Sequence, residues 1–337
     1  MTRSSTAATA TAMVLALMAA TPAASESAEA FYKDRQLSLI VSFNAGGGAD
    51  AYARLVGRHL GRHLPGEPKV LVKNMPGAGG LLAANHLYNV APRDGSVLGM
   101  FPGNIASLPL LKPAQVKFDV SLFKWIGSPA TEVMLCVTSP TACVKSFEQL
   151  FGKEMVTGTA GTASHDVPAT LNGILGTKLK LVGGYKGSSG LRLATERGEI
   201  EGFCGIGYDS LKPAIVAGRL TPIVQVAVQD SPELKGVPNI FRYAKTDEQR
   251  QLLRLMLIWG ELARPIVAPP ETPEPIFLAL RKGFGATMKD PAFLEDAAKL
   301  SLSVEPVSGE QITTMIADVY RTPRDIIDKA AALLQKR

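Results

Sequence analysis

Two glycine-rich segments are the parts of this 337-residue sequence best suited to bind a small ligand. Loop one is residues 43–50 (FNAGGGAD) and loop two is residues 157–166 (TGTAGTASHD). Neither contains Lys or Arg, so each offers glycine, which lets the backbone approach a ligand, and N–H groups at a helix start. Such groups bind carboxylate or phosphate, at roughly 1.5–3 kcal/mol per charge-assisted hydrogen bond. Either loop alone fits a plain tight turn equally well, but together they predict a site that holds both ends of a small dicarboxylate.

Motifs for catalysis and for nucleotide binding are incomplete. The run at residues 46–48 does not extend to GxGxxG, and no GxxxxGK[ST] motif occurs. Ser164, His165 and Asp166 are the residue types of a catalytic triad, but adjacent side chains point apart and cannot form a relay. No GxSxG elbow is present. A polar loop that opens a helix is the better interpretation of this segment.

A histidine pair also has the spacing of metal ligands. His59 and His63 lie four positions apart, which puts them on one side of a helix. They stand among Arg58 and Arg62, and the glutamate of an HExxH motif is missing. The surrounding charge favours a solvated basic face.

Strands and helices must alternate around the two loops to position them. Residues 37–43 are a continuous apolar run of strand length, and after loop one the apolar residues recur at helical spacing. Further strands are expected at residues 70–72, 96–101, 132–137, 154–157, 178–182, 200–205 and 220–228. Further helices are expected at residues 81–90, 166–175, 188–197, 275–288 and 309–334. This alternation predicts an α/β fold with largely parallel sheets, in two units with a cleft between them. Because ligands of such sheets bind at the carboxyl ends of strands, both loops should face the cleft.

Composition and the amino terminus narrow the class of protein. The amino terminus has the layout of a secretory signal peptide: Arg3, then an uncharged run at residues 7–20, then small residues at 23–30. Cleavage is expected between Ala23 and Ala30. The run is too short to span a bilayer comfortably. Hydrophobic residues make up 46% and charged residues 20%, which excludes a disordered chain. The net charge of +6 comes from scattered basic residues without interleaved aromatic ones, so nucleic acid binding is excluded.

The three cysteines fit an oxidising compartment, with one disulfide and one free thiol. Spacing does not fix the pairing. Cys136 and Cys204 both lie in apolar strand-like runs, which favours a bridge between them. A bridge from Cys136 to Cys143 across a turn is the alternative.

Six segments carry a resemblance to a known family: loop one, NMPGAGG at 74–80, APRDG at 91–95, GYKG at 184–187, GEIEG at 198–202 and APPETP at 268–273. In order and spacing the sequence resembles the substrate-binding proteins of tripartite tricarboxylate transporters, the Bug-type periplasmic receptors. The resemblance runs from about residue 37 to the C-terminus. Two departures are Asn44, where the family commonly has Pro, and a shorter loop two.

The resemblance implies a two-lobed periplasmic binding protein fold of type II-like organisation, with a mixed sheet flanked by helices in each lobe and the ligand cleft between them. The expected divisions are a cleaved leader at 1–25, a first lobe at 31–125, a second lobe at 126–220, and the rest of the first lobe at 221–337. Delivery to integral membrane permease subunits is the expected partnership, and we also expect a monomer with no cofactor and no metal.

Carried onto this sequence, the family's binding mode implies ligand contacts from both loops and from the ends of two strands. Asp50 either receives an amino or hydroxyl group of the ligand or caps its own helix. The expected ligand-binding residues are Phe43, Asn44, Ala45, Gly46, Gly47, Gly48, Asp50, Asn104, Ser107, Gly158, Thr159, Ala160, Gly161, Thr162, Ser164, His165, Tyr208 and Asp209.

The leading hypothesis is a periplasmic receptor that captures a small mono-, di- or tricarboxylate and delivers it to a permease. A second hypothesis is a periplasmic sensor that reports the same ligand to a signalling partner. A third is a secreted α/β hydrolase, for which Ser164, His165 and Asp209 are the residues to test.

Overall fold

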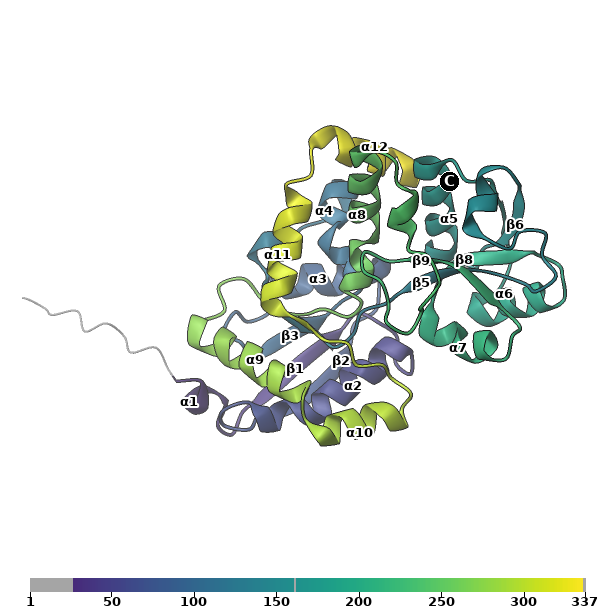
Figure 1. The fold of residues 1–337 in the computed structure, drawn as a ribbon. Coiled ribbons are helices and arrows are strands. Elements are labelled where there is room, and N and C mark those ends of the chain that lie inside the picture. The colour runs from purple at the N-terminus through teal and green to yellow at the C-terminus, as the bar shows by residue number, and fades with distance from the viewer. Residues whose placement is uncertain (1–26, 161, 336–337) are drawn as a thin grey trace, which may run out of the picture.

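The structure is a computed structural model that describes residues 27–160 and 162–335. In that part of the chain strands β1 to β11 form two sheets, one in each of two lobes that lie side by side (Figure 1). The first sheet has the order β11 (Val307–Ser308), β4 (Lys124–Ser128), β10 (Ile266–Ala268), β3 (Val97–Met100), β1 (Gln36–Val41), β2 (Lys69–Asn74). The second has the order β7 (Leu179–Val182), β6 (Met155–Gly158), β8 (Gly202–Gly207), β5 (Met134–Thr138), β9 (Thr221–Val226).

Both sheets are mixed, and each contains a parallel core. Strands β2, β1 and β3 are parallel to one another. Strand β10 runs antiparallel to its neighbours β3 and β4, and β11 runs antiparallel to β4. In the second sheet β7, β6 and β8 are parallel, and β5 runs antiparallel to β8 and β9. The expected class, two mixed sheets flanked by helices, is confirmed.

Helices cover both faces of both sheets (Figure 1). Those of the first lobe are α1 (Ala28–Tyr32), α2 (Gly48–Leu60), α3 (Leu81–Asn89), α4 (Leu108–Leu111), α9 (Glu274–Thr287), α10 (Pro291–Lys299) and α11 (Gly309–Tyr320). Those of the second lobe are α5 (Thr162–Leu175), α6 (Gly187–Glu196) and α7 (Tyr208–Val216). Two more, α8 (Asp247–Glu261) and α12 (Arg324–Gln335), pack against each other and against α5.

The alternation of side chains along the strands explains why both faces are covered. Leu37, Leu39 and Val41 of β1 enter one apolar cluster with α2 and α9, whereas Ile40 enters another. That second cluster also contains Cys136 of β5 and residues of α8 and α12, so one apolar core continues from lobe to lobe. Strands buried on both faces read as continuous apolar runs, which is why residues 37–43 were recognisable.

The expected lobe boundaries need correction. The boundary at 125/126 falls inside β4, all of which belongs to the first sheet. The boundary at 220/221 precedes β9, which pairs with β5 and so belongs to the second sheet. The chain therefore crosses between lobes at residues 129–133 and again after Val226.

Three helical predictions were also incomplete. The expected helix over 309–334 is two helices, because Pro323 lacks the N–H that a continuous helix requires. Helix α5 begins at Thr162, earlier than expected. Helices α8 and α10 were not predicted; most of residues 252–258 are buried in α8, so no one-sided pattern shows its period.

Cys136 and Cys204 form a disulfide, the pairing that the sequence favoured. They are direct partners in the β5–β8 ladder, with their Cα atoms 4.0 Å apart. Cys143 is free and exposed. Among residues 27–160 and 162–335, no helix is long and apolar enough to cross a membrane; the predicted signal peptide lies outside this described part.

Candidate functional site

Loop one connects the end of β1 to the start of α2, and Asp50 fixes its shape. The Oδ2 atom of Asp50 accepts the N–H of Gly46 at 2.9 Å and the Nε–H of Arg54 at 2.8 Å. Its Oδ1 atom accepts Nδ2 of Asn74 at 2.8 Å, and the same Nδ2 donates to the carbonyl of Phe43 at 3.0 Å. The Asp50 side chain is thus engaged on both oxygens inside the first lobe.

The network shows what Asp50 does within the first lobe. The residue is only 2% exposed, and the hydrogen bond from Arg54 lowers the pKa of its carboxyl to about 2. Because protein donors engage both carboxylate oxygens, Asp50 holds loop one to Asn74 and Arg54. The N-cap residue Gly47 makes no side-chain cap, so the first N–H groups of α2 depend on other acceptors.

Loop two connects β6 to α5 and has a similar internal bond. The N–H of Ala160 donates to Oγ of Ser164 at 2.8 Å. Behind the loop, Gly205 of β8 has φ +79°, and a Cβ atom there would lie 2.4 Å from the carbonyl oxygen of Ala163. Loop two therefore rests directly on the β8 backbone, which only glycine permits. Gly161 lies outside the described residues.

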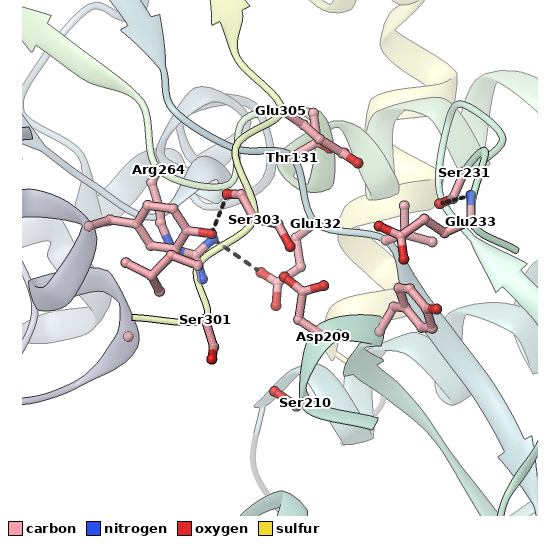
Figure 2. Close-up of a pocket in the computed structure, with 16 residues that line it drawn as sticks. Thr131, Glu132, Asp209, Ser210, Ser231, Glu233, Arg264, Ser301, Ser303 and Glu305 are labelled. Atoms are coloured by element: carbon pink, nitrogen blue, oxygen red, sulfur yellow. Dashed lines mark hydrogen bonds and ion pairs between the residues drawn. The ribbon is translucent and has the colours of Figure 1, made fainter. Parts of the chain in front are cut away.

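A polar cavity of about 250 Å³ opens at the junction of the lobes (Figure 2). Its lining comes from the start of α2, both crossing segments, the β8–α7 junction and the segment before β11. The lining residues are Gly48, Tyr52, Thr131, Glu132, Val133, Gly207, Tyr208, Asp209, Ser210, Ser231, Glu233, Arg264, Ser301, Leu302, Ser303 and Glu305. The structure thus brings Gly48 of loop one together with the expected residues Tyr208 and Asp209.

Arg264 is the only Lys or Arg among those lining residues. Its guanidinium lies 4.7 Å from the ring centre of Tyr52, and Nη1 lies 3.9 Å from Oε2 of Glu132. Its Nε atom is buried and has no hydrogen-bond partner among the described residues. The Tyr52 hydroxyl donates to the Ser303 carbonyl at 2.7 Å, and burial raises its pKa to about 12, so Tyr52 is a neutral wall of the cavity.

Three of the four carboxylates in the polar cavity already have partners. Glu132 faces Arg264, Glu233 binds Nζ of Lys212 at 2.6 Å, and Glu305 accepts the hydroxyl of Thr131 at 2.6 Å. Asp209, in the first turn of α7, has no hydrogen-bond or ion-pair partner within the described part of the chain. In Figure 2 the side chains of Glu132 and Asp209 point into the space next to Arg264. Asp209 is therefore the open acceptor of this cavity.

A second, mainly apolar cavity of about 280 Å³ adjoins the start of α5. Its lining combines the segment after β3, α4, the first half of α5, α8, and the ends of β9 and α12. The lining residues are Pro102, Asn104, Ser107, Leu108, Leu111, Lys112, Ala163, Asp166, Val167, Thr170, Leu171, Val226, Met256, Leu257, Trp259 and Leu334. The expected residues Asn104 and Ser107 thus meet the start of α5 here and not at the polar cavity.

The remaining expected residues line neither cavity. They are Phe43, Asn44, Ala45, Gly46, Gly47, Asp50, Gly158, Thr159, Ala160, Ser164 and His165. The side chain of Thr162, like Gly161, lies outside what the structure describes. Sequence reasoning missed Arg264, Glu132, Glu305 and Trp259. No local signal marks them, because each reaches its cavity through long-range packing.

The candidate hydrolase residues Ser164, His165 and Asp209 do not line one common cavity. Ser164 Oγ accepts the Ala160 N–H, and Nδ1 of His165 lies 3.2 Å from Oδ1 of Asp166. Asp209 lines the polar cavity, whereas Asp166 lines the apolar one. The serine hydroxyl thus has a structural use in holding loop two.

The expectation of a solvated face for the histidine pair was wrong. His59 is only 5% exposed, packs edge-on against Phe293 and lies 3.0 Å from Oδ2 of Asp296. His63 lies 2.7 Å from Oδ2 of Asp290. The pair connects α2 and the turn after it to α10.

Comparisons with known proteins bear on the family and the fold of the chain. The sequence model of the Tripartite tricarboxylate transporter family receptor (TctC) matches residues 53–332. A protein of Agrobacterium vitis, described as "UPF0065 protein in the TAR-I ttuE-ttuC' intergenic region", is 28% identical over 295 residues, or 85% of this chain and 80% of that protein.

Two solved structures have a similar fold. A TctC solute binding protein from Polaromonas, without ligand, has a TM-score of 0.71 at 17% identity and covers 88% of this chain and 99% of that one. MatC from Rhodopseudomonas palustris, with bound malate, has a TM-score of 0.61 at 19% identity and covers 87% and 99%.

Proposed function

The chain belongs to the tripartite tricarboxylate transporter receptor family, and on that premise we propose that it captures a small carboxylate between its lobes and delivers it to a membrane permease. Two-lobed proteins of this kind close on their ligand by a hinge motion. The crossing segment at 129–133 supplies Glu132 to the polar cavity, and the connection from α8 to β10 supplies Arg264, so closure there would change the ligand's surroundings directly.

The observation that carries this proposal is the state of Arg264. Among the described residues its buried Nε–H has no acceptor, and Nη1 lies 3.9 Å from Oε2 of Glu132. An unsatisfied buried donor costs about 1–3 kcal/mol. A ligand carboxylate would supply that acceptor and would also meet the first N–H groups of α2 beside Gly48.

Asp209 restricts which functional groups the ligand can carry. An open carboxylate next to the proposed anion site repels a second ligand carboxylate but accepts a hydroxyl or ammonium donor. We therefore propose that the ligand carries such a donor near its carboxylate. The malate bound to MatC, a protein of similar fold, carries a hydroxyl beside a carboxylate, but it also carries the second carboxylate that Asp209 would repel here.

We infer that the protein works in the periplasm as a monomer after removal of residues 1–25. The support is the leader-like sequence and membership in a family of transporter receptors. The oxidising compartment that this implies is consistent with the disulfide between Cys136 and Cys204.

Calorimetry on unfolded and refolded protein, freed of any retained ligand, tests the proposal. A panel of small carboxylates should contain at least one that binds, and Arg264→Gln should weaken its binding about tenfold to a hundredfold. Arg321→Gln is the control, because the Arg321 side chain is 78% exposed and its ion pair with Asp318 lies at the protein surface. If no carboxylate binds the wild-type protein, or if both variants bind equally well, the proposal fails.

A further inference from the structure

The polar cavity has a surplus of negative charge, although the chain as a whole has a net charge of +6. Four of its lining residues carry a carboxylate: Glu132, Asp209, Glu233 and Glu305. The cation among the lining residues is Arg264. Glu233 is balanced from outside the lining by Lys212, whose Nζ lies 2.6 Å from Oε2 of Glu233. Three carboxylates therefore face one guanidinium.

The charges of the cavity act on the same small space, as their effect on Tyr52 shows. Burial raises the pKa of the Tyr52 hydroxyl to about 12, and nearby charges act on it as well. The positive charge of Arg264 lowers this pKa. Three carboxylates raise it: Asp209, Glu132 and Glu305. All four charges thus lie within electrostatic reach of one hydroxyl in the cavity wall.

Glu132 and Asp209 are the carboxylates at the centre of this surplus. Both point into the space next to Arg264 (Figure 2). Oε1 of Glu132 lies against the backbone at Gly207, where an added Cβ atom would be only 2.5 Å away, and Asp209 begins α7 two residues later. When a ligand carboxylate binds Arg264, Glu132 shares its cation with that ligand. Glu132 and Asp209 then both need a further positive partner.

We propose that the polar cavity selects a carboxylate whose positive charges outnumber its negative ones, such as a basic amino acid. This inference rests on the proposed function and adds the class of solute. The ligand carboxylate contacts Arg264, and its α-ammonium lies between Asp209 and Glu132. A second cationic group lies towards Glu305, which forms no ion pair within the described residues. Opposite charges a few Å apart attract strongly in a partly dry cavity, whereas a dicarboxylate would add to the surplus of negative charge.

Four solutes of similar length test the order of affinity by calorimetry. Ornithine, glutamine and glutamate are net positive, neutral and net negative at neutral pH, and each step should weaken binding about tenfold. 2-Hydroxyglutarate has a hydroxyl where glutamate has its ammonium, and should bind about tenfold more weakly again. The affinity for ornithine should fall as the salt concentration rises, because salt screens the attraction.

Variants of two lining residues separate the two cationic groups of the ligand. Asp209→Asn should weaken the binding of ornithine and of glutamine about tenfold, because both carry the α-ammonium. Glu305→Gln should weaken ornithine about fivefold and leave glutamine within about twofold. Asp318→Asn is the control for charge: Asp318 pairs with Arg321 at 2.9 Å and lines neither cavity, so both affinities should stay within about twofold. A circular dichroism melt shows that each variant is folded at the assay temperature.

The outcomes distinguish failure of this inference from failure of the proposed function. Malate and citrate are titrated beside the amino acids, and all solutions contain EDTA. Tightest binding of ornithine, weakened by both lining variants and not by Asp318→Asn, supports the inference. Tighter binding of any neutral or anionic solute, equal affinities in the lining variants and the control, or binding that needs calcium in place of EDTA overturns it and leaves the receptor function standing. Binding of no carboxylate, amino acids included, overturns both.

Discussion

The two glycine loops have the same plan but are held by different forces. In each, an N–H of the loop donates to a side chain four residues later, from Gly46 to Asp50 at 2.9 Å and from Ala160 to Ser164 at 2.8 Å. In loop one the acceptor is a carboxylate that also binds Arg54 and Asn74. In loop two it is a neutral hydroxyl, and the loop lies directly on Gly205 of β8.

The conformation of loop one therefore depends on a charged side chain, and that of loop two depends on close packing against β8. A charged network within one lobe fixes loop one before any ligand arrives. Loop two is fixed by a close backbone contact, so its position depends on the volume available at β8. Changes in charge should therefore act on loop one, and changes in side-chain volume should act on loop two.

The largest expected effect comes from adding a methyl group beneath loop two. Gly205→Ala combines a positive φ of +79° with a Cβ atom 2.4 Å from the Ala163 carbonyl, and should lower the free energy of unfolding by about 2–4 kcal/mol. Gly46→Ala is the matched control in loop one. It has a similar φ of +83° with no atom within 4 Å of the added Cβ, and should cost about 1–2 kcal/mol from backbone strain alone. Denaturant unfolding measures both, and equal losses would contradict the role of shape.

The next effect removes the charge that holds loop one. Asp50→Asn keeps the size of the side chain but weakens its bonds to Arg54 and Gly46, and should cost about 1–3 kcal/mol. Asp247→Asn is the control, because Asp247 is 91% exposed in its ion pair with Arg250 and should cost less than about 0.5 kcal/mol. If the two variants have the same denaturation midpoint, the charged network does not hold loop one.

A smaller effect is expected from the hydroxyl of loop two. Ser164→Ala leaves the Ala160 N–H without this acceptor and should cost about 1 kcal/mol, less than Asp50→Asn. Hydrogen exchange measured by NMR should show faster exchange at Ala160 and unchanged exchange at Gly46. Loss of protection at both amides would mean that the loops are coupled, contrary to the comparison.

Acid should separate the loops without any mutation. The pKa of Asp50 is about 2 in the folded protein, below the unfolded value of about 3.9, so its contribution to stability is complete above about pH 4 and is lost as the pH falls towards 2. Protection of the Gly46 amide, corrected for intrinsic exchange, should decrease over this range. The Ala160 amide, held by a neutral acceptor, should change less, and Asp50→Asn should remove the difference.

The sequence predicted the fold where local patterns were strong. Residues 37–43 are an apolar run followed by a glycine turn; β1 lies in the run and α2 begins in the turn. The order of strands and helices around both loops followed from the same signals. It failed where packing hides periodicity, as in α8, and at the lobe boundaries, because only strand pairing reveals that β9 returns to β5. For the site, loop one was visible because glycine takes backbone conformations that other residues avoid, as Gly46 does with φ +83°.

The sequence by itself determined that the chain has two α/β units with a glycine loop in each, and it pointed to a family of transporter receptors. Which side chains distant in the sequence line each cavity depended on the tertiary structure. It assigned Asp50 to loop one, left Asp209 open, put Arg264 beside it and gathered Leu111, Val167 and Trp259 around one apolar space. The physical reason is that local propensity depends on neighbours along the chain, whereas charge pairing and cavity walls depend on contacts between residues far apart in sequence.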